Sequence, residues 1–378
     1  MTFELPEGKE GVLPAHWLRE AIAAKAIHAG NFVIPDANIQ PASLDLRLGE
    51  VAYRMRCSFL PGRETVESRR KDLMLDELDL RREGVVLEAG RPYLIPLKEQ
   101  LDLPAGVRAK ANPKSSTGRA DVFTRVITDG SYRFDEIEDG YSGGLYLEVV
   151  PLSFPIRVRE DLSLNQLRLS VGRTELSDDE IREHHRTEPL LFLDGEPIPA
   201  DDLALANGMF LGLDLHGEPE RVIGYRARAN APLLDLSQIR SVPVGPFWET
   251  VHSEDGTRIV LNPRAFYLLM SREAVTIPPS LAAEMTAYDP TSGELRTHYA
   301  GFFDPGFGYD PTGALAGSTA ALEVRAHDVP FMVEHGQRVC KLTFEHMLAA
   351  PETLYGQGIG SNYQGQTETL GKHFLPPG

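Results

Sequence analysis

The chain carries one sequence pattern twice, and this duplication constrains its fold more than any other feature. Residues 84–106 align with residues 258–280 at a constant offset, which pairs Tyr93 with Tyr267. Two further matches follow in the same order, 111–119 with 288–296 and 145–158 with 320–333, and a looser match of 44–56 with 213–228 precedes them. Because unrelated segments rarely keep a common order, the chain is predicted to contain two copies of one structural unit.

Short apolar runs between turn residues indicate the class of that unit. The 34 glycines and 28 prolines are spread along the whole chain, between runs such as 145–152 that are rich in Val, Leu and Tyr. This texture predicts many short strands in a sandwich or barrel. Two helices are expected, one over residues 15–29 that ends at Gly30 and one that begins at Ser177, where Glu180 completes a capping box.

The matched segments also divide the chain. Residues 1–171 are expected to form a first module and residues 208–350 a second. Residues 172–207 are interpreted as an acidic connector that contains the second helix. Residues 351–378 form a tail too rich in Gly and Gln to pack a core, which predicts either a disordered end or a lid.

Charge and cysteine content exclude several functions. The formal net charge of −17 disfavours binding to nucleic acid polymers and to anionic membranes. Cys57 and Cys340 are far apart in sequence, so neither a disulfide framework nor a paired-thiolate zinc site is expected. No leader sequence opens the chain, which predicts a cytoplasmic protein. His184 and His185 point to different faces of the second helix and are interpreted as solvent-facing.

Three groups of residues could carry chemistry. The stretch PKSSTGR (113–119) offers hydroxyls, N–H groups and cations to an anion such as phosphate, with a surface turn as the alternative. Glu148 and Glu323 each follow apolar residues in an expected strand, where each could be a buried general base or a solvent-facing side chain. Asp304 lies in an Asp-Pro-Gly turn and could accept a sugar hydroxyl or serve only a hairpin.

The chain resembles the dCTP deaminase branch of the dUTPase-like superfamily in an ordered set of motifs. These are PASLDLRLG (41–49), PKSSTGR, GYSGGLYLEV (140–149), AGFFDPGF (300–307), ALEV (321–324) and YGQGIGSNYQGQ (355–366). The match spans nearly the whole chain and looks like the long, tandem form of the enzyme. It implies a mostly β fold of two tandem dUTPase-like modules, each a distorted β-barrel or jelly roll, with a few short helices. It also implies a homotrimer with active sites between neighbouring modules.

The resemblance assigns roles to individual positions. The segment that binds phosphate and positions water is matched by Lys114, Ser115, Ser116 and Arg119. The glutamate that acts as base and then as proton donor is matched by both Glu148 and Glu323. The turn that contacts deoxyribose and pyrimidine is matched by Ala300 and Asp304, and the C-terminal lid is matched by Tyr355, Tyr363 and Gln366.

The departures from the family pattern fall on different repeats. The first repeat replaces the base-binding turn with the longer, more acidic TDGSYRFDEIEDGYSG (128–143), and the second has Gly293 where a second serine is expected. Asn362 stands where the family often has lysine. One hypothesis is a composite site, with its phosphate loop from the first repeat and its base pocket, glutamate and lid from the second. The alternative is two stacked rings of three modules, each ring with one type of site.

The implied reaction is hydrolysis of dCTP to dUTP and ammonia. The glutamate takes a proton from water, hydroxide adds at C4 of cytosine, and the same carboxyl protonates the leaving amine. Zinc is not expected, because the sequence lacks the H-x-E and P-C-x-x-C pattern of the zinc deaminases, and Mg²⁺ is expected to arrive with the triphosphate. Further candidate ligands are dUTP and dTTP. Two alternatives stay open: a dUTP pyrophosphatase or bifunctional enzyme, and a non-catalytic dNTP-binding regulatory protein.

Overall fold

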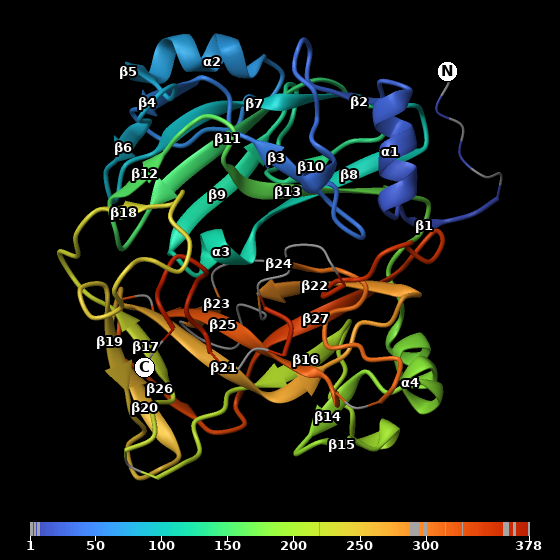
Figure 1. The fold of residues 1–378 in the computed structure, drawn as a ribbon, viewed down its shortest axis with the longest axis vertical. Coiled ribbons are helices and arrows are strands. Elements are labelled where there is room, and N and C mark those ends of the chain that lie inside the picture. Colours follow the sequence, from blue (N-terminus) through green and yellow to red (C-terminus); the bar gives the residue numbers. More distant parts are fainter. Residues whose placement is uncertain are drawn as a thin grey trace. The chain divides into compact units, whose positions relative to one another are not determined.

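The structure is a computed structural model with two compact units (Figure 1). It describes residues 3, 5, 8–218, 220–287, 295–297, 301–313, 315–326, 328–357, 363–365 and 368–376. Unit 1 comprises Met1–Thr174, Asn230–Pro243 and Lys372–Gly378. Unit 2 comprises Glu175–Ala229 and Val244–Gly371.

Unit 1 is built mainly from strands. Its elements are β1 (Gly11–Val12), α1 (Ala15–Ala23), β2 (Ile27–His28), a 3-10 helix (Asp36–Asn38), β3 (Leu44–Arg47), β4 (Val51–Met55), α2 (Val66–Leu73), β5 (Met74–Asp79), β6 (Val85–Leu87), β7 (Tyr93–Asp102), β8 (Val107–Pro113), α3 (Ser115–Gly118), β9 (Val122–Ile127), β10 (Glu136–Ile137), β11 (Ser142–Pro151), β12 (Ile156–Val158), β13 (Ser163–Val171) and β18 (Leu234–Asp235). One sheet has the order β1-β13-β8-β10, with β3 paired to β13. A second has the order β5-β4-β7-β11-β9, with β2 paired to β7, and a third has the order β18-β12-β6.

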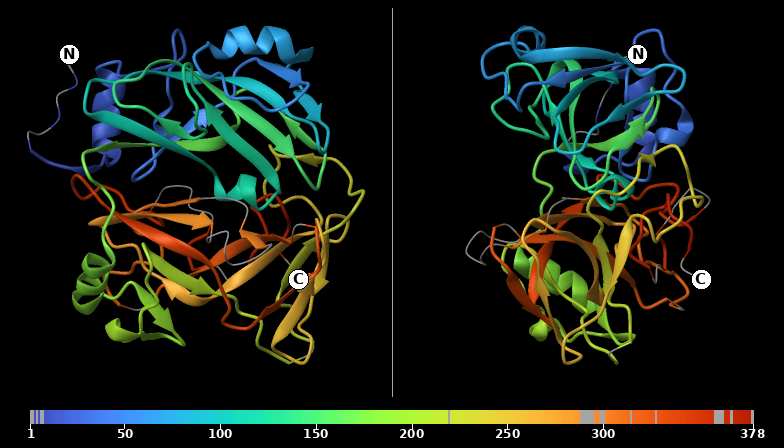
Figure 2. Two further views of the ribbon diagram at one scale, coloured as in Figure 1. Left: turned by 180° about the vertical axis from the view of Figure 1, so that it is seen from behind. Right: turned by 90° about the vertical axis from the view of Figure 1, so that its left-hand side faces the viewer.

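Unit 2 has a closely similar set of elements. They are α4 (Asp178–Thr187), β14 (Leu191–Leu193), β15 (Glu196–Pro197), a 3-10 helix (Ala200–Asp202), β16 (Met209–Gly212), β17 (Gly224–Ala227), β19 (Trp248–Val251), β20 (Arg258–Leu261), β21 (Phe266–Val275), β22 (Leu281–Ala287), β23 (Leu295–Thr297), β24 (Gly301–Phe303), β25 (Ser318–Ala326), β26 (Phe331–Glu334) and β27 (Arg338–His346). The sheet β15-β14-β21-β17-β19, joined by β25 and β23, and the sheet β16-β27-β22-β24 both contribute to one core. Figure 2 shows, in its right-hand view, the strands of this unit curving around a common interior. The expectation of a mostly β fold with a few short helices is confirmed.

Strand register confirms the duplication residue by residue. Glu148 on β11 lies opposite Leu94 on β7, and Glu323 on β25 lies opposite Leu268 on β21. The aligned tyrosines also make the same bond. The Tyr93 hydroxyl accepts the Glu88 N–H at 3.1 Å, and the Tyr267 hydroxyl accepts the Asn262 N–H at 2.9 Å. Both copies therefore have the same strand register and the same tyrosine hydrogen bond.

The segment interpreted as a connector is instead the start of the second copy. β2 pairs β7 with Ile27 opposite Leu101, and β14 pairs β21 with Leu191 opposite Val275, so α4 is the counterpart of α1. The strand positions just before the two helices also correspond. The Leu13 N–H bonds the Leu169 carbonyl and the Leu176 N–H bonds the Phe344 carbonyl, each at 2.9 Å. The two segments share little sequence, and only pairing with the sheet reveals the match.

One of the two expected helices begins where predicted, and the other ends earlier than predicted. α4 begins as predicted, with the Ser177 hydroxyl and the Glu180 carboxylate forming a capping box. α1 ends at Ala23 and not near Gly30. The Lys25 N–H bonds the Ile22 carbonyl and the Ala26 N–H bonds the Ala21 carbonyl, with Lys25 at φ 64°. This is the helix-ending Schellman arrangement, formed here without its usual glycine.

Two other sequence interpretations are corrected by the structure. His185 is 3% exposed, not solvent-facing, and its Nε2–H donates to the Ile198 carbonyl at 2.7 Å. The counterpart of β3 is β16 rather than 213–215, because Leu44 pairs with Leu167 and Met209 pairs with Leu342 at the matching point of the last strand. The loose match of the two Leu-Asp-Leu stretches was therefore four residues out of register.

Candidate active site

Glu148 lies near the middle of the unit 1 sheet, on β11 between β7 and β9. Leu94 and Arg125 lie opposite it in register, so the three side chains share one face. Glu148 is only 3% exposed. Its Oε1 accepts hydrogen bonds from Nε and Nη2 of Arg125, at 3.1 and 2.6 Å. Of the two alternatives for this residue, the structure shows the buried one, and the Arg125 guanidinium is bonded to its carboxylate.

Unit 1 covers this face with two segments, one between β4 and β5 and one between β9 and β10. The Arg125 guanidinium stacks on Phe134, 3.6 Å from the ring centroid, and donates to Ser58 Oγ at 2.8 Å. Leu94 belongs to a small apolar cluster with Met55, Val66 and Ile127, of which Val66 opens α2. Tyr53, Phe59, Leu73, Phe134 and Tyr146 pack against that cluster. The glutamate of unit 1 is therefore enclosed by its own unit.

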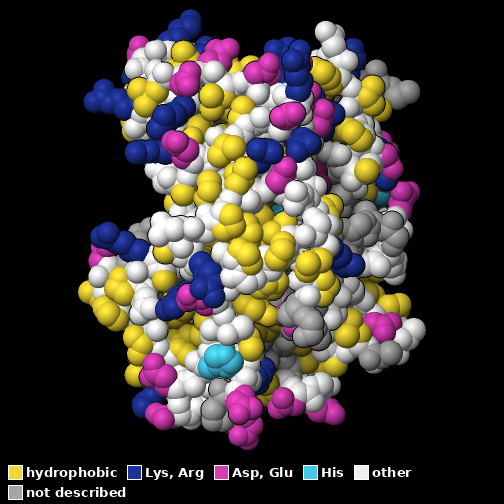
Figure 3. Space-filling view, turned by 60° about the vertical axis from the view of Figure 1, so that its left-hand side comes forward, with side chains coloured by type: hydrophobic (Ala, Val, Ile, Leu, Met, Phe, Trp, Pro, Cys, Tyr) yellow, Lys and Arg dark blue, Asp and Glu magenta, His cyan; other side chains and the backbone are white. Residues whose placement is uncertain are grey.

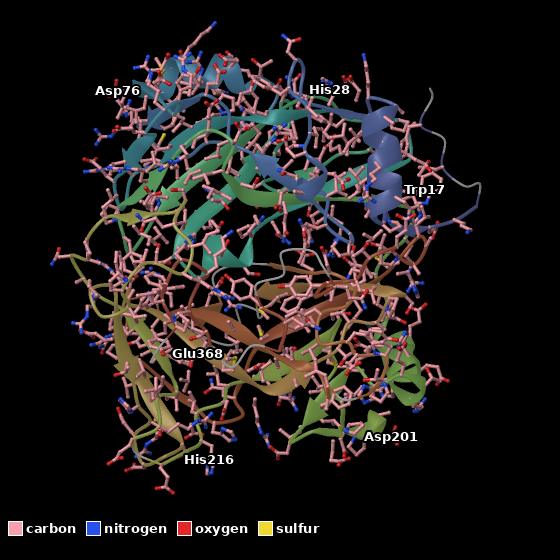
Figure 4. The ribbon with its side chains drawn as sticks, viewed as in Figure 1. Trp17, His28, Asp76, Asp201, His216 and Glu368 are labelled. Carbon is pink, nitrogen blue, oxygen red and sulfur yellow. The ribbon has the colours of Figure 1, made fainter. Side chains whose placement is uncertain are left out.

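Glu323 occupies the same strand position in unit 2, in a different setting. It is half-buried, and Leu268 lies opposite it and opposite Tyr225, which places all three in one row. The Tyr225 hydroxyl donates to Oε2 of Glu368 at 3.3 Å. Burial, together with the Glu368 carboxylate, raises the pKa of Tyr225 to about 12. Glu368 belongs to the C-terminal tail and is marked in Figure 4 within unit 2, so the tail reaches this row.

Asp304 begins a turn directly after β24, and its side chain is 7% exposed. The Phe307 N–H bonds the Asp304 carbonyl at 3.2 Å, and the Ile277 N–H bonds the Phe307 carbonyl at 2.8 Å. Unit 1 makes the same two bonds at Glu138, Tyr141 and Leu103, at 3.2 and 2.9 Å. The first repeat therefore keeps this turn, with Glu138 in place of Asp304. The expectation that it had replaced the turn is wrong, because its additional residues lie before it.

The tail of unit 2 is held on the Asp304 turn. The Tyr355 N–H bonds the Pro305 carbonyl at 2.8 Å, and the rings of Phe307 and Tyr355 lie 5.8 Å apart. Gln364 bonds the turn twice: its Nε2 donates to the Gly306 carbonyl at 3.2 Å and its Oε1 accepts the Gly308 N–H at 3.1 Å. Gly306 has φ 104°, and a Cβ there would lie 2.6 Å from the Tyr355 nitrogen. The turn and tail are therefore built to lie in contact.

The stretch PKSSTGR is a helical turn that is mostly buried. Ser115 is exposed, whereas Ser116, Thr117 and Arg119 are 6%, 2% and 3% exposed. Thr117 Oγ1 donates to the Leu164 carbonyl at 2.8 Å, which ties α3 to β13. Lys114 precedes the helix, and its Nζ forms an ion pair with Asp45 on β3. The surface-turn alternative is therefore wrong for most of this stretch.

Several predicted site residues are brought together and others are not described. Tyr355 contacts the turn that Asp304 begins, and Tyr363, 9% exposed, directly precedes Gln364, which bonds the same turn. Ser115, Ser116, Arg119 and Lys114 lie together in unit 1. Ala300, Gln366, Ser292, Gly293 and Asn362 lie outside the described residues.

The match of residues 111–119 with 288–296 pairs Arg119 with Arg296, and strand register does not support this pairing. Arg296 lies opposite Arg325 on β25, the position that Phe123 takes opposite Val150 in unit 1. Arg296 is thus the counterpart of Phe123. The sequence alignment also missed Asp45, Gln364 and the pairing of Arg125 with Glu148. Gln364 could have been found only by its place beside Tyr363 in the tail motif, and the other two only through strand pairing.

No group of three or more His, Cys, Asp or Glu side chains that could hold a metal ion occurs in the described part of the chain. Within that same part, no helix is long and apolar enough to cross a membrane. Figure 3 shows one face of the molecule, where Lys and Arg side chains stand beside Asp and Glu side chains.

Two family models match almost the whole chain. Residues 9–173 match the N-terminal domain of 2'-deoxycytidine 5'-triphosphate deaminase, and residues 177–374 match its C-terminal domain. The boundary between the matches falls where the two units meet in sequence, at Thr174 and Glu175.

Individual proteins agree with the family models. The crystal structure of a 2'-deoxycytidine 5'-triphosphate deaminase from Agrobacterium tumefaciens is 45% identical, with a TM-score of 0.85, over 93% of this chain and 100% of that one. A dCTP deaminase of Natronomonas pharaonis is 32% identical over 143 residues, 37% of this chain and 68% of its own. A "dCTP deaminase, dUMP-forming" of Corynebacterium glutamicum (strain R) is 34% identical over 119 residues, 31% of this chain and 59% of its own. The expectation of two dUTPase-like modules is confirmed, and the chain belongs to the dCTP deaminase family.

Proposed function

We propose that this protein hydrolyses dCTP to dUTP and ammonia, and that Glu323 activates the attacking water. The observation that carries the proposal is the setting of Glu323. It is half-buried and lies in the unit whose tail is held on the Asp304 turn. A general base must be within reach of the water it activates. Glu148, at the equivalent position, is enclosed and bonded to Arg125, and we assign it a structural role.

In the proposed reaction, the Glu323 carboxylate takes a proton from water as the oxygen bonds to C4 of cytosine. The carboxyl then passes that proton to the amino nitrogen, and the C4–N bond breaks to release ammonia. The remaining proton of the added hydroxyl moves to N3, which leaves a C4 carbonyl. Asp304 accepts the deoxyribose hydroxyl, and the backbone near Ala300 contacts the pyrimidine. Tyr355, Tyr363 and Gln366 belong to the tail that excludes bulk water from the bound nucleotide.

For unit 1 we propose phosphate binding at Lys114, Ser115, Ser116 and Arg119. Exposed Ser115 offers a hydroxyl, and the cations around it suit phosphate oxygens. Mg²⁺ enters bound to the triphosphate, since hard oxygen ligands favour it. Titration with EDTA at fixed dCTP should therefore lower the rate, and added Mg²⁺ should restore it.

The test is ammonia release from dCTP by the wild type and by two matched variants. E323Q should lower kcat by roughly 10²- to 10⁴-fold, the range for removal of a general base. E148Q should keep kcat within about tenfold of wild type, because Glu148 does not touch the reacting atoms. Full activity in both single variants would exclude any single-glutamate mechanism. Tight dCTP binding without ammonia release by the wild type would favour a regulatory protein.

A second candidate is deamination followed by cleavage to dUMP. The relative from Corynebacterium glutamicum carries the name "dUMP-forming". Chromatography of the products of dCTP distinguishes the two: dUTP with ammonia supports the first candidate, and dUMP with pyrophosphate supports the second. A parallel assay with dUTP as substrate detects pyrophosphatase activity by itself.

We also propose a cytoplasmic homo-oligomer, with a trimer favoured, and dTTP as a feedback ligand. The family resemblance is what supports these points. Light scattering coupled to size exclusion measures the mass of the assembly, which for a trimer is three times the 41.8 kDa chain. Initial rates at increasing dTTP measure feedback.

A further inference from the structure

The tail of unit 2 is bonded to the sheet on both sides of β21. On one side, the Gly365 N–H donates to the hydroxyl of Ser318, the first residue of β25, at 3.0 Å. On the other side, the Tyr225 hydroxyl on β17 donates at 3.3 Å to Oε2 of Glu368, which is labelled in Figure 4. β21 pairs with both β17 and β25. Two tail residues only three positions apart are therefore bonded to strands that lie on opposite sides of β21.

Tyr225 is suited to hold the tail. It is 7% exposed, and burial raises the pKa of its hydroxyl to about 12, so the group stays protonated and remains a donor at neutral pH. A hydrogen bond to a carboxylate is stronger than one between neutral groups. The backbones of Tyr225 and Glu323 are two strand spacings apart, roughly 10 Å. Tyr225 is therefore placed to position the tail and not to contact the water beside Glu323.

Unit 1 covers the equivalent tyrosine with a different segment. Tyr53 takes the strand position of Tyr225, since each lies opposite the leucine that also faces the glutamate of its unit. The Arg70 guanidinium on α2 lies 4.2 Å from the centroid of the Tyr53 ring. The corresponding chain of unit 2, between β17 and β19, includes residues 230–243, which belong to unit 1. At the position where unit 1 uses α2, unit 2 therefore uses its tail.

We propose that Tyr225 is a positioning residue for the deamination of dCTP, which holds the C-terminal tail against the row of Glu323 through its bond to Glu368. The inference rests on the proposed function, because it takes Glu323 as the base and the tail as the segment that excludes bulk water. A tail that is already bonded before the nucleotide arrives loses less conformational freedom on binding. Without the Tyr225 hydroxyl, part of the binding free energy of dCTP would be used to order the tail, which raises KM.

The first test compares the two equivalent tyrosines. Y225F keeps the ring and removes only the hydroxyl. It should raise the KM for dCTP by about 3- to 10-fold and change kcat by less than about twofold, because the tail is ordered in both the ground and the transition state. Y53F makes the same change in unit 1, where Arg70 contacts the face of the ring, and is the matched control that should behave as wild type. An equal fall in kcat and kcat/KM in Y225F would contradict a positioning role.

Variants of Glu368 test whether Tyr225 acts through this carboxylate. E368Q retains an oxygen that can accept the Tyr225 hydroxyl and should stay within about threefold of the wild-type KM. E368A removes the acceptor and should raise KM at least as much as Y225F does. Adding Y225F to E368A should then change KM by less than about twofold, because the bond is already absent. Increases in KM that multiply in the double variant would overturn the inference.

A second readout separates this inference from the proposed function. Hydrogen exchange of the nucleotide-free, full-length protein, followed by mass spectrometry, should be about threefold or more faster in Y225F for peptides that contain residues 363–371. Peptides from β7 should exchange as in the wild type. An unchanged KM in Y225F would overturn the inference, and so would a raised KM without faster exchange of the tail. If the wild type releases no ammonia from dCTP, the proposed function fails, while hydrogen exchange still decides whether Tyr225 holds the tail.

Discussion

The two copies place a glutamate at the same strand position and surround it differently. In unit 1, Glu148 is bonded to Arg125 and covered by α2 and Phe134. In unit 2, Glu323 is half-buried, and the tail reaches its row through Glu368. Strand register is fixed by the buried face of a sheet, because a slip by one residue would turn every core side chain outward. The outer face has no such constraint, and there the duplicated copies have diverged.

The largest stability effect expected from this comparison concerns the ion pair of unit 1. E148Q leaves the Arg125 guanidinium half-buried without its carboxylate and should lower the free energy of unfolding by roughly 3–4 kcal/mol. E323Q, at the equivalent position of unit 2, should cost less, about 1 kcal/mol, because Glu323 is only half-buried. Urea denaturation measures both. The double variant R125M/E148L should regain most of the loss, and equal losses in E148Q and E323Q would contradict the contrast drawn between the units.

A slightly smaller effect should appear as a pH dependence of the free energy of unfolding. Its source is His373 near the C-terminal end, which is 3% exposed and whose Nδ1–H donates to the Gln238 carbonyl at 2.8 Å. The folded-state pKa of His373 is about 4, below the ordinary value of 6.5, so the unfolded chain binds a proton first as the pH falls. The stabilisation is complete above pH 6.5 and is lost as the pH falls toward 4, up to about 3 kcal/mol. The H373N variant should flatten the loss of melting temperature in this window, with H216N, at an exposed histidine, as control. If the melting temperature of H373N depended on pH as strongly as that of the wild type, His373 would not be the cause of this dependence.

A third difference between the units is the tail that lies on the Asp304 turn of unit 2. Q364A removes two hydrogen bonds to the Asp304 turn and should cost about 1–2 kcal/mol. Because unit 1 keeps its turn without this tail, the equivalent unit 1 turn should be unaffected. Hydrogen exchange measured by mass spectrometry can follow peptides from both turns at once. Faster exchange only around 304–308 is expected, and equal change at 138–142 would contradict it.

The smallest effect concerns the two equivalent helices. α4 has a capping box at Ser177, whereas α1 begins after Pro14 with no side-chain cap. S177A makes the start of α4 similar to that of α1 and should cost about 1 kcal/mol. Thermal unfolding followed by circular dichroism measures the shift, and S241A, at an exposed serine outside the helices, provides the control. A loss well above that value would mean that Ser177 does more than cap α4.

The sequence determined those features that depend on residues close together in the chain. The capping box at Ser177 could be predicted because its partners lie three residues apart. The mostly β texture and the duplication followed from apolar runs and from segments such as 84–106, whose counterparts lie at a constant offset. The site motifs were also found in this way, because each is a continuous stretch.

Only the tertiary structure decided which distant residues meet. It identified α4 as the counterpart of α1, paired Glu148 with Arg125, and docked residues 372–375 against residues 240–242. Each of these depends on strand register or on chain docking, which is set by the packing of the whole unit and leaves no local pattern. For the same reason, two glutamates that look alike in sequence, each preceded by Leu and followed by Val, have different surroundings in the folded protein.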